Sequence, residues 1–109
     1  MIVVSNTSPL CYLVLIGQAE VLPKLYGSVA TTQTVLTELC HPDAPPLIRA
    51  WATTPPDWLK AHPDPAPSDN ALADLDAGER TAILLAEKLH ADVVLLDESA
   101  ARTLARNAG

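Results

Sequence analysis

The sequence is poor in aromatic residues, basic residues and cysteine, and it has no long apolar run. Phe is absent and aromatic residues make up 4% of the chain, so the core must be built from aliphatic side chains. Lys and Arg number 7 against 13 Asp and Glu, and the net charge of −6 excludes attraction of nucleic acid or anionic lipid by overall positive charge. The apolar stretch Leu10–Ile16 is far shorter than the roughly 20 residues of a membrane-spanning helix.

The two cysteines, Cys11 and Cys40, do not have the spacing of a zinc site. We expect both to be free, buried thiols in a reducing compartment. The N-terminus has neither the basic region nor the cleavage site of a signal peptide, so we expect a cytoplasmic protein. The length of 109 residues and the hydrophobic content of 49% indicate one packed domain over the whole chain.

Short apolar segments alternate with amphipathic ones. We predict strands over Ile2–Ser5, Ser28–Ala30, Trp58-Leu59 (an edge strand) and Asp92–Leu96. We predict helices from Ser8 to near Gly17, from Ala19 to Tyr26, from Thr31–Gln33 to Leu39, from Pro46 to Thr53, from Glu79 to His90 and from Glu98 to Arg106. In the first of these helices, Ser8 is the expected N-cap and Pro9 the first helical residue. The alternation predicts a three-layer α/β/α sandwich with a central parallel sheet.

A polar residue follows each of two apolar strands. Asn6 ends the first strand and Asp97 follows the last one. The carboxyl ends of parallel strands meet at one edge of the sheet, where ligands bind in folds of this class. Each residue also has a structural alternative, because Asn and Asp are common turn and helix-capping residues.

Two glutamates lie on or beside the apolar stripes of predicted helices. At 100° per residue, Glu79 shares one face with Ala82, Ile83, Ala86 and His90, so it heads the predicted inward stripe. The alternative for Glu79 is a first-turn residue favoured by the helix dipole. Glu38 flanks a second apolar stripe, and its alternative is a solvated helix residue.

These residues together indicate metal chemistry. Hard oxygen ligands of this kind suit Mg²⁺ or Mn²⁺, and two such ions can hold the attacking and leaving oxygens of a phosphodiester. The set therefore favours a nuclease. The three histidines, His41, His62 and His90, are isolated and form no metal-binding motif.

The order and spacing of four short motifs resemble those of PIN-domain nucleases, in particular the VapC-like toxin branch. The motifs are VVSNTSPL, VLTEL, LDAGERTAILLAEKL and ADVVLLDESAAR, and the resemblance covers Ile2 to Gly109. It implies a divalent metal pocket, held by Asn6, Glu38, Glu79 and Asp97, that cleaves RNA. The carboxylates of Glu38, Glu79 and Asp97 would be the catalytic ones, with Mg²⁺ or Mn²⁺ as the cofactor. Thr7 and Ser8 match the hydroxyl pair that follows the first acid, and we expect Ser8 to act as the helix cap.

The resemblance also implies a toxin of a toxin–antitoxin system, with a homodimer and a small antitoxin protein as partners. The sequence departs from the family pattern in three places. Asn6 replaces the first acid, Leu95 replaces a common Thr, and the family's last strand and helix would follow Gly109. We therefore expect a single PIN-like domain over residues 1–109 that is C-terminally truncated or part of a longer protein.

Of two other functional classes, the sequence allows one, a binding module, and disfavours the other, phosphoryl transfer. A PIN-like module that binds RNA or protein without cutting is favoured by Asn6. Phosphoryl transfer of the dehalogenase type needs an Asp where Asn6 stands, and the receiver type needs an acidic pair there. Arg102 and Arg106 are candidate RNA contacts, with surface charges as the alternative. Trp51 and Trp58 are expected to pack the proline-rich segment His41–Ser68 onto the body or to anchor a partner helix.

Overall fold

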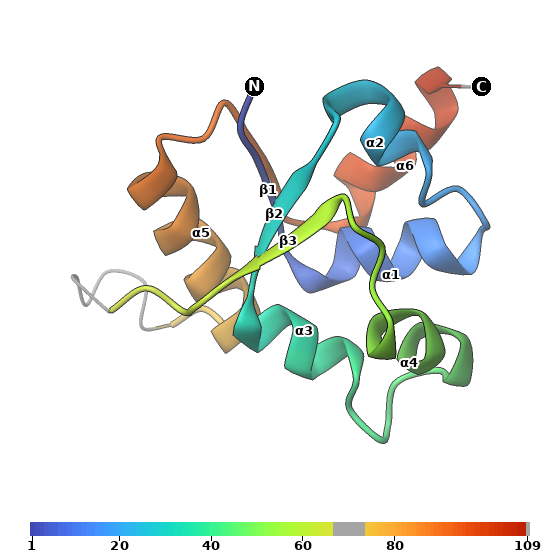
Figure 1. Ribbon diagram of the computed structural model, residues 1–109, viewed down its shortest axis with the longest axis horizontal. Helices are drawn as coiled ribbons and strands as arrows, with labels where there is room; N and C mark the ends of the chain where they lie inside the picture. The colour runs from blue at the N-terminus through green and yellow to red at the C-terminus, as the bar shows by residue number, and fades with distance from the viewer. Residues whose placement is uncertain (67–73, 109) are drawn as a thin grey trace.

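A four-stranded, all-parallel sheet runs through the middle of the computed structural model, in the order β3-β2-β1-β4 (Figure 1). The structure describes residues 1–66 and 74–108. The strands are β1 (Val3–Ser5), β2 (Val29–Thr32), β3 (Leu59–His62) and β4 (Val93–Leu95). The predicted α/β sandwich with a central parallel sheet is confirmed.

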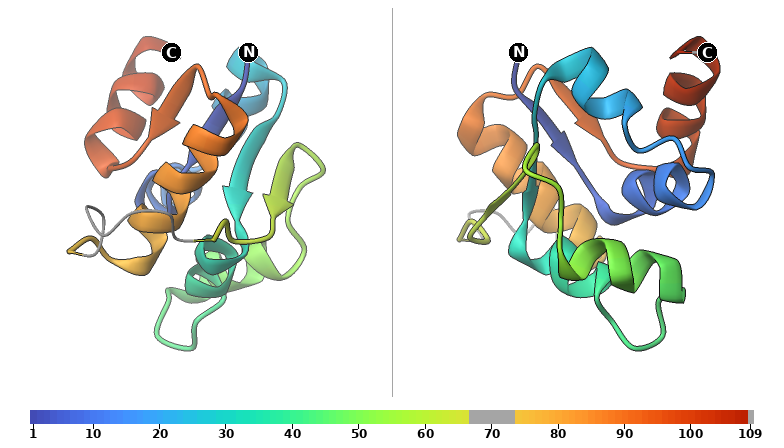
Figure 2. Two further views of the ribbon diagram at one scale, coloured as in Figure 1. Left: turned by 90° about the vertical axis from the view of Figure 1, so that its left-hand side faces the viewer. Right: turned by 45° about the vertical axis from the view of Figure 1, so that its right-hand side comes forward.

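Helices cover both faces of the sheet. Helix α5 packs on one face, and α1, α2 and α6 lie on the other, as Figures 1 and 2 show. Helices α3 and α4 lie beyond the ends of the strands at the bottom of Figure 1. The helices are α1 (Thr7–Leu15), α2 (Val21–Tyr26), α3 (Gln33–Leu39), α4 (Pro46–Thr53), α5 (Ala77–Leu89) and α6 (Glu98–Ala108).

The alternation of side chains along β1 divides the core in two. Val3 points to the larger apolar cluster, which it shares with Leu13 and Leu95, whereas Val4 points to the cluster under α5 with Leu85. Both valines are at most 1% exposed. A strand buried on both faces explains why the first segment reads as a continuous apolar run.

The structure corrects several predicted element boundaries; for example, α5 begins at Ala77 and not at Glu79. Helix α1 begins at Thr7 with Asn6 at the N-cap position, so the prediction of Ser8 as the cap is wrong. Pro9 still lies in the first turn, where its missing N–H costs no helical hydrogen bond. Strand β2 continues to Thr32, which is the N-cap of α3 and accepts a hydrogen bond from the Val35 N–H at 3.2 Å.

The proline-rich segment packs onto the body through its tryptophans, as predicted. Trp51 and Trp58 have ring centroids 6.1 Å apart and both contact the larger apolar cluster. The strand at Trp58-Leu59 begins one residue later and runs to His62. Residues 67 and 68 lie outside the described residues. Both thiols are free, but the prediction that both are buried is wrong, because Cys11 is only half-buried and Cys40 is exposed. None of the helices within the described ranges is long and apolar enough to span a membrane.

Candidate functional site

The carboxyl ends of the strands bring three helix N-termini to one edge of the sheet. Helices α1, α3 and α6 begin within three residues of the ends of β1, β2 and β4 respectively. Positive ends of helix dipoles and polar strand-end residues therefore meet at this edge. Asn6 and Asp97, the two strand-end residues singled out in the sequence, both belong to it.

Asn6 ties the end of β1 to the end of β4. Its backbone N–H donates to the Leu95 carbonyl at 2.9 Å, and its side-chain Nδ2 donates to the Leu96 carbonyl at 3.1 Å. The second bond fixes which way the amide points, because the opposite orientation would set two oxygens against each other. The side chain is 4% exposed, and its Oδ1 has no hydrogen-bond partner. It therefore does not cap α1, although it stands at the N-cap position.

The unpartnered Asn6 oxygen and the Glu38 carboxylate meet above Gly78. A Cβ placed on Gly78 would lie 2.8 Å from Asn6 Oδ1 and 3.1 Å from Glu38 Cδ, and closer still to Glu38 Oε1. Two oxygen acceptors thus occupy the space that any other residue at position 78 would fill. The Asn6 oxygen has no donor of its own, and a cation bound between it and the carboxylate would satisfy it.

Two residues of α1 interact with the Glu38 carboxylate, one by a hydrogen bond and one electrostatically. The Thr7 hydroxyl donates to Glu38 Oε1 at 2.5 Å and so holds the carboxylate in place. Burial raises the pKa of the Cys11 thiol, and the negative charge of Glu38 raises it further. This places the thiol within the electrostatic reach of Glu38, a relation that the sequence did not suggest.

Glu79 and Asp97 are chain neighbours of residues that touch this pair. Glu79 follows Gly78 in the first turn of α5, and its side chain is half-buried. Its backbone N–H donates to the carboxylate of Asp76, the helix N-cap. Asp97 follows Leu96, whose carbonyl holds the Asn6 amide. One Asp97 oxygen, Oδ1, accepts the Ala100 N–H at 2.9 Å, so part of this carboxylate caps α6. Asn6 and Glu38 both approach Gly78, whereas no three of the described acidic, His and Cys side chains, Glu79 and Asp97 included, lie close enough to form a metal cluster.

The predicted inward stripe of α5 is confirmed at Ala82 and Ala86, which are buried, and is wrong at Glu79 and His90. The buried face of this helix is headed by Gly78 and continues through Thr81, Ala82 and Leu85, while Glu79 flanks it and His90 is exposed. The reason is steric, because the position directly under Asn6 and Glu38 admits no side chain.

Whether a metal ion fits this edge depends on which oxygen donors lie together there. Within residues 1–66 and 74–108, no three His, Cys, Asp or Glu side chains lie close enough to hold a metal ion by themselves. The Asn6 amide adds a neutral oxygen that is buried, oriented and without a partner. Carboxylate and amide oxygens are the ligands that Mg²⁺ and Mn²⁺ prefer, so the pair fits such an ion as part of a larger oxygen set.

A cleft of about 390 Å³ is lined by Thr7, whose hydroxyl holds the Glu38 carboxylate. Its lining also includes Ser8, Tyr12 and Glu98. Arg102 leans over the Tyr12 ring, with its guanidinium carbon 5.7 Å from the ring centroid, and forms an ion pair with Glu98 at 2.7 Å. Ser8 and Arg106 are exposed.

Sequence reasoning overlooked Gly78, whose role depends on what lies above it. The only available signal was its place directly before Glu79 in the motif LDAGERTAILLAEKL. The buried pair of hydroxyls from Thr32 and Thr81, 2.9 Å apart, was also not anticipated.

Comparison with known families identifies one match. A family model described as a PIN domain matches residues 2–109. Comparison with curated proteins and with solved structures finds no match.

Proposed function

Because the chain belongs to the PIN-domain family, we propose that it is a divalent-metal-dependent endoribonuclease. The proposed metal is Mg²⁺ or Mn²⁺, and the proposed ligands are Asn6, Glu38, Glu79 and Asp97. PIN domains are generally nucleases that use divalent metals, which supports the class of reaction. The finer assignment rests on residues of this chain.

The observation that carries the proposal is the unpartnered Asn6 Oδ1 facing the Glu38 carboxylate above Gly78. A buried polar atom without a hydrogen-bond partner lowers the stability of the folded state by on the order of 1–3 kcal/mol. A cation bound at Asn6 Oδ1 would recover this stability. The Nδ2 bond to the Leu96 carbonyl prevents the amide from turning to relieve the loss. The metal-free site therefore keeps an unsatisfied acceptor.

Each residue has a distinct part in the proposed reaction. When bound by these residues, a divalent ion would supply positive charge for the phosphodiester and would lower the pKa of water. Thr7 orients the Glu38 carboxylate, and Gly78 leaves the space in which the ligand oxygens face each other. Glu79 and the free oxygen of Asp97 complete the ligand set, and either can orient the attacking water.

The RNA is proposed to run along the cleft that begins at Thr7. Ser8, no longer a helix cap, offers a hydroxyl from that cleft, and the Tyr12 ring offers a surface for a base. Arg102 and Arg106 are the proposed phosphate contacts. The net charge of −6 makes such local cations and the metal necessary for holding an anionic substrate.

The test is RNA cleavage by the purified protein with Mg²⁺ or Mn²⁺, comparing Glu38→Gln, Glu79→Gln and Asp97→Asn. Each should lose activity about 100-fold or more, because each removes a ligand charge. Glu87→Gln, an exposed glutamate on the same helix as Glu79, is the matched control and should cleave normally. Normal cleavage by Glu79→Gln and Asp97→Asn would refute the mechanism.

A second function is favoured by one specific observation, the amide at the first acidic position. A PIN module with one ligand charge fewer would bind RNA or protein without cutting it. Calorimetric titration with Mn²⁺ separates the two: no heat at millimolar metal supports the binding module, whereas saturable binding that Glu38→Gln weakens supports the enzyme.

We further propose a toxin role in the cytoplasm, with a homodimer and a small antitoxin as partners. Expression in bacteria should then arrest growth in a manner that Glu38→Gln abolishes, and sedimentation should give twice the monomer mass. Normal growth with active enzyme would contradict the toxin role.

A further inference from the structure

A small cavity lies between β3 and the carboxyl end of α5, next to the residues that precede β1 and β2. Its volume is about 210 Å³, and its walls include Ile2, Ser28, Ala30 and Leu89. The short side chain of Ala30 leaves this space open beneath the last turn of α5. None of the lining residues belongs to β4 or α6.

The basic side chains of Lys60 and His62 line the same cavity because they lie two residues apart on β3. In the register of the sheet, Lys60 stands opposite Ala30 and His62 opposite Thr32. Ala30 packs in the apolar cluster under α5, and the Thr32 hydroxyl bonds to Thr81 of that helix. Both basic side chains therefore lie on the α5 face of the sheet.

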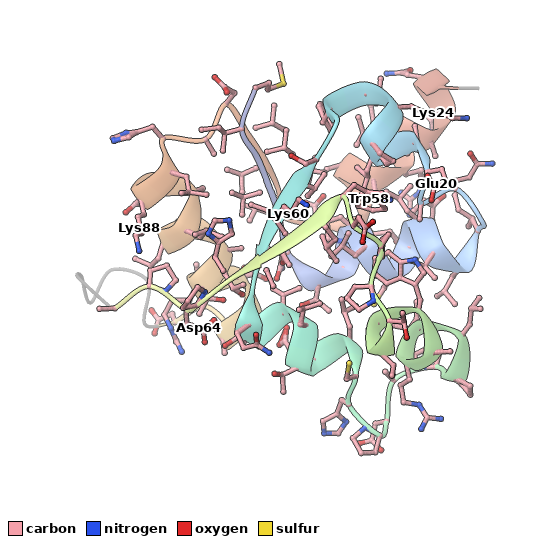
Figure 3. The ribbon with its side chains drawn as sticks, in the orientation of Figure 1. Glu20, Lys24, Trp58, Lys60, Asp64 and Lys88 are labelled. Carbon is pink, nitrogen blue, oxygen red and sulfur yellow. The ribbon has the colours of Figure 1, made fainter. Side chains whose placement is uncertain are left out.

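The positive charge of Lys60, which Figure 3 labels on β3, is not offset by a neighbouring acid. No carboxylate is among the residues that line the cavity. The ion pairs formed within the described part of the chain involve His41 and Arg102, not Lys60. Lys88, in contrast, lines another cavity together with its chain neighbour Glu87. An uncompensated lysine in a cavity stands out in a chain whose net charge is −6.

Two groups with negative oxygens border the cavity, and each is hydrogen-bonded to the protein. Asp92 Oδ2 accepts the backbone N–H of Ile2 at 2.7 Å. The Ala86 carbonyl, in the last turn of α5, accepts the Ala91 N–H at 2.9 Å. These oxygens are directed toward donors of the protein, so the cavity keeps the positive sign that Lys60 gives it.

The polar groups that line the cavity are hydrogen-bond donors. The Lys60 ammonium has three N–H donors and no acceptor, the His62 ring has at least one N–H in either protonation state, and the Ser28 hydroxyl also donates. An anion with several acceptor oxygens matches such a set. The cavity is smaller than the roughly 300–1,000 Å³ of pockets that enclose drug-sized ligands, so a single phosphate group fits it better than a whole nucleotide.

We propose that Lys60, His62 and Ser28 bind a phosphate group in this cavity. Lys60 supplies the charge, the other two donors orient the oxygens, and the apolar walls at Ile2 and Leu89 limit the size of the ligand. Inorganic phosphate and an RNA phosphodiester share this chemistry. The proposal does not depend on the nuclease function, because none of these residues belongs to the proposed metal site.

The test is an NMR titration of the full chain with inorganic phosphate, without divalent metal and at constant ionic strength. The expected result is saturable change in the amide signals of Ser28, Lys60 and His62 at millimolar phosphate. Lys60→Gln should weaken binding about tenfold, because it removes a charge-assisted hydrogen bond. Lys60→Arg keeps the charge and should retain most of the affinity.

Three further variants separate the cavity from overall charge. Lys24→Gln makes the same charge change on the exposed surface of α2 and is the matched control, so it should leave the affinity unchanged (Figure 3). Ser28→Ala and His62→Leu each keep the Lys60 charge but remove a donor. Each should weaken phosphate binding about threefold.

A 2′-O-methyl RNA oligomer with a 5′-hydroxyl, which resists cleavage, identifies the source of the phosphate. Tighter binding of the oligomer, weakened by Lys60→Gln at the same amide signals, supports the proposal with RNA as the source. Binding of inorganic phosphate alone at these signals supports it with free phosphate as the source.

Two outcomes would overturn the proposal. Absence of saturation with both probes would show that the cavity holds no phosphate. Equal weakening by Lys60→Gln and Lys24→Gln would show that phosphate responds only to overall charge. Neither outcome bears on the nuclease, because no metal is present and no cleavage is measured.

Discussion

Two sets of buried polar groups lie side by side at the carboxyl ends of β1 and β2, and they differ in how well their hydrogen bonds are satisfied. In the hydroxyl cluster, formed by Ser5, Thr31, Thr32 and Thr81, every side chain has a partner. In the amide–carboxylate pair, formed by Asn6 and Glu38, the Asn6 Oδ1 has none. Both sets are built from strand ends and the first turns of helices.

The hydroxyl cluster has a structural role. Thr81 donates to the Ala77 carbonyl, so its oxygen can accept from Thr32, which in turn accepts the Val35 N–H. A closed chain of this kind leaves no group for a ligand. The pair, in contrast, sets two acceptors against each other. Of the described side chains, the other buried unpartnered atom is Trp58 Nε1, before β3 at the opposite end of the sheet.

The contrast teaches that burial alone does not mark a site. Thr31 and Thr32 are 0% exposed and their hydroxyls stabilise the fold, whereas Asn6 is 4% exposed and its unpartnered oxygen lowers the stability. Proteins tend to break local rules where function requires it. Substitutions in the two sets should therefore move activity and stability separately.

The largest effect is expected from Gly78→Ala, which fills the space of the pair. Alanine ordinarily stabilises a helix relative to glycine by about 0.5–1 kcal/mol, but here its Cβ would overlap the Glu38 carboxylate. The site should lose cleavage by about 100-fold or more, because ligand oxygens displaced by an ångström no longer converge. Cleavage rate and Mn²⁺ affinity by calorimetry provide the measurement.

A double variant provides the control for this steric explanation. Glu38→Ala added to Gly78→Ala removes the closest overlap, so it should recover part of the stability lost in the single variant while cleavage stays absent; Asn6 Oδ1, 2.8 Å from the new Cβ, accounts for the rest. Strong non-additivity of this kind is expected only for residues in contact. Additive losses of stability would show that Gly78 is not under Glu38.

The next largest effect is expected from Asn6→Asp, which removes the Nδ2 donor to the Leu96 carbonyl. The carboxylate would face that carbonyl and Glu38 with no donor, so the metal-free protein should lose about 3 kcal/mol of unfolding free energy. Mn²⁺ should recover more stability in this variant than in the parent, because the added charge strengthens metal binding. Thermal unfolding with and without Mn²⁺ measures both.

Asn107→Asp, on the exposed side of α6, is the matched control and should shift neither quantity appreciably. If Asn6→Asp neither changes stability nor tightens Mn²⁺ binding, Asn6 is structural and the assignment of the first ligand position is wrong.

A smaller effect, confined to stability, is expected in the hydroxyl cluster. Thr81→Val keeps the side-chain shape but leaves the buried Thr32 hydroxyl without its acceptor. The unfolding free energy should fall by about 1–2 kcal/mol, while cleavage per folded molecule is unchanged. Urea denaturation and the cleavage rate are measured on the same sample.

Thr103→Val is the control for this substitution, because Thr103 makes the same bond to the carbonyl four residues earlier but is exposed on α6. A loss of cleavage in Thr81→Val at unchanged stability would remove the distinction between the two sets.

The sequence predicted the layers of the fold because the two central apolar segments, around β1 and β4, alternate with helical ones. The segments ending at Ser5 and before Asp97 could be nothing but buried parallel strands once helices alternated with them. The exact start of α1 was not predictable, because Ser5, Asn6, Thr7 and Ser8 are all competent caps. Which one caps depends on the bonds that Asn6 makes with β4, across 90 residues of chain.

The candidate site was predictable as a set of positions but not as a geometry. Family resemblance pointed to Glu38 and Thr7, yet their hydrogen bond joins helices 31 residues apart. The role of Gly78 could not be read from the chain, because a missing side chain has meaning only when its neighbours are placed. The relation of the Cys11 thiol to Glu38 could not be predicted either, because the positions of the two cysteines in the sequence indicate only isolated, small apolar residues.

The smallest effect concerns that thiol and reports on the pair without any cleavage. Burial and the Glu38 charge raise the pKa of Cys11, so its thiolate should form, and react with iodoacetamide, at higher pH than an ordinary cysteine. The unfolded chain loses this proton at lower pH than the folded chain. The thiol's contribution to stability is therefore complete below the ordinary cysteine pKa and is lost as pH rises through the raised pKa of the folded protein.

Glu38→Gln should shift the reactivity profile to lower pH only in part, because burial is the larger cause. Mn²⁺ bound at Glu38 should shift it in the same direction. The measurement uses a Cys40→Ser background, and Cys40 alkylation in a Cys11→Ser chain, unaffected by Glu38→Gln, is the control. If neither Glu38→Gln nor Mn²⁺ changes the Cys11 reactivity profile, the Glu38 carboxylate does not act on this thiol. The electrostatic part of the proposed amide–carboxylate pair would then be wrong.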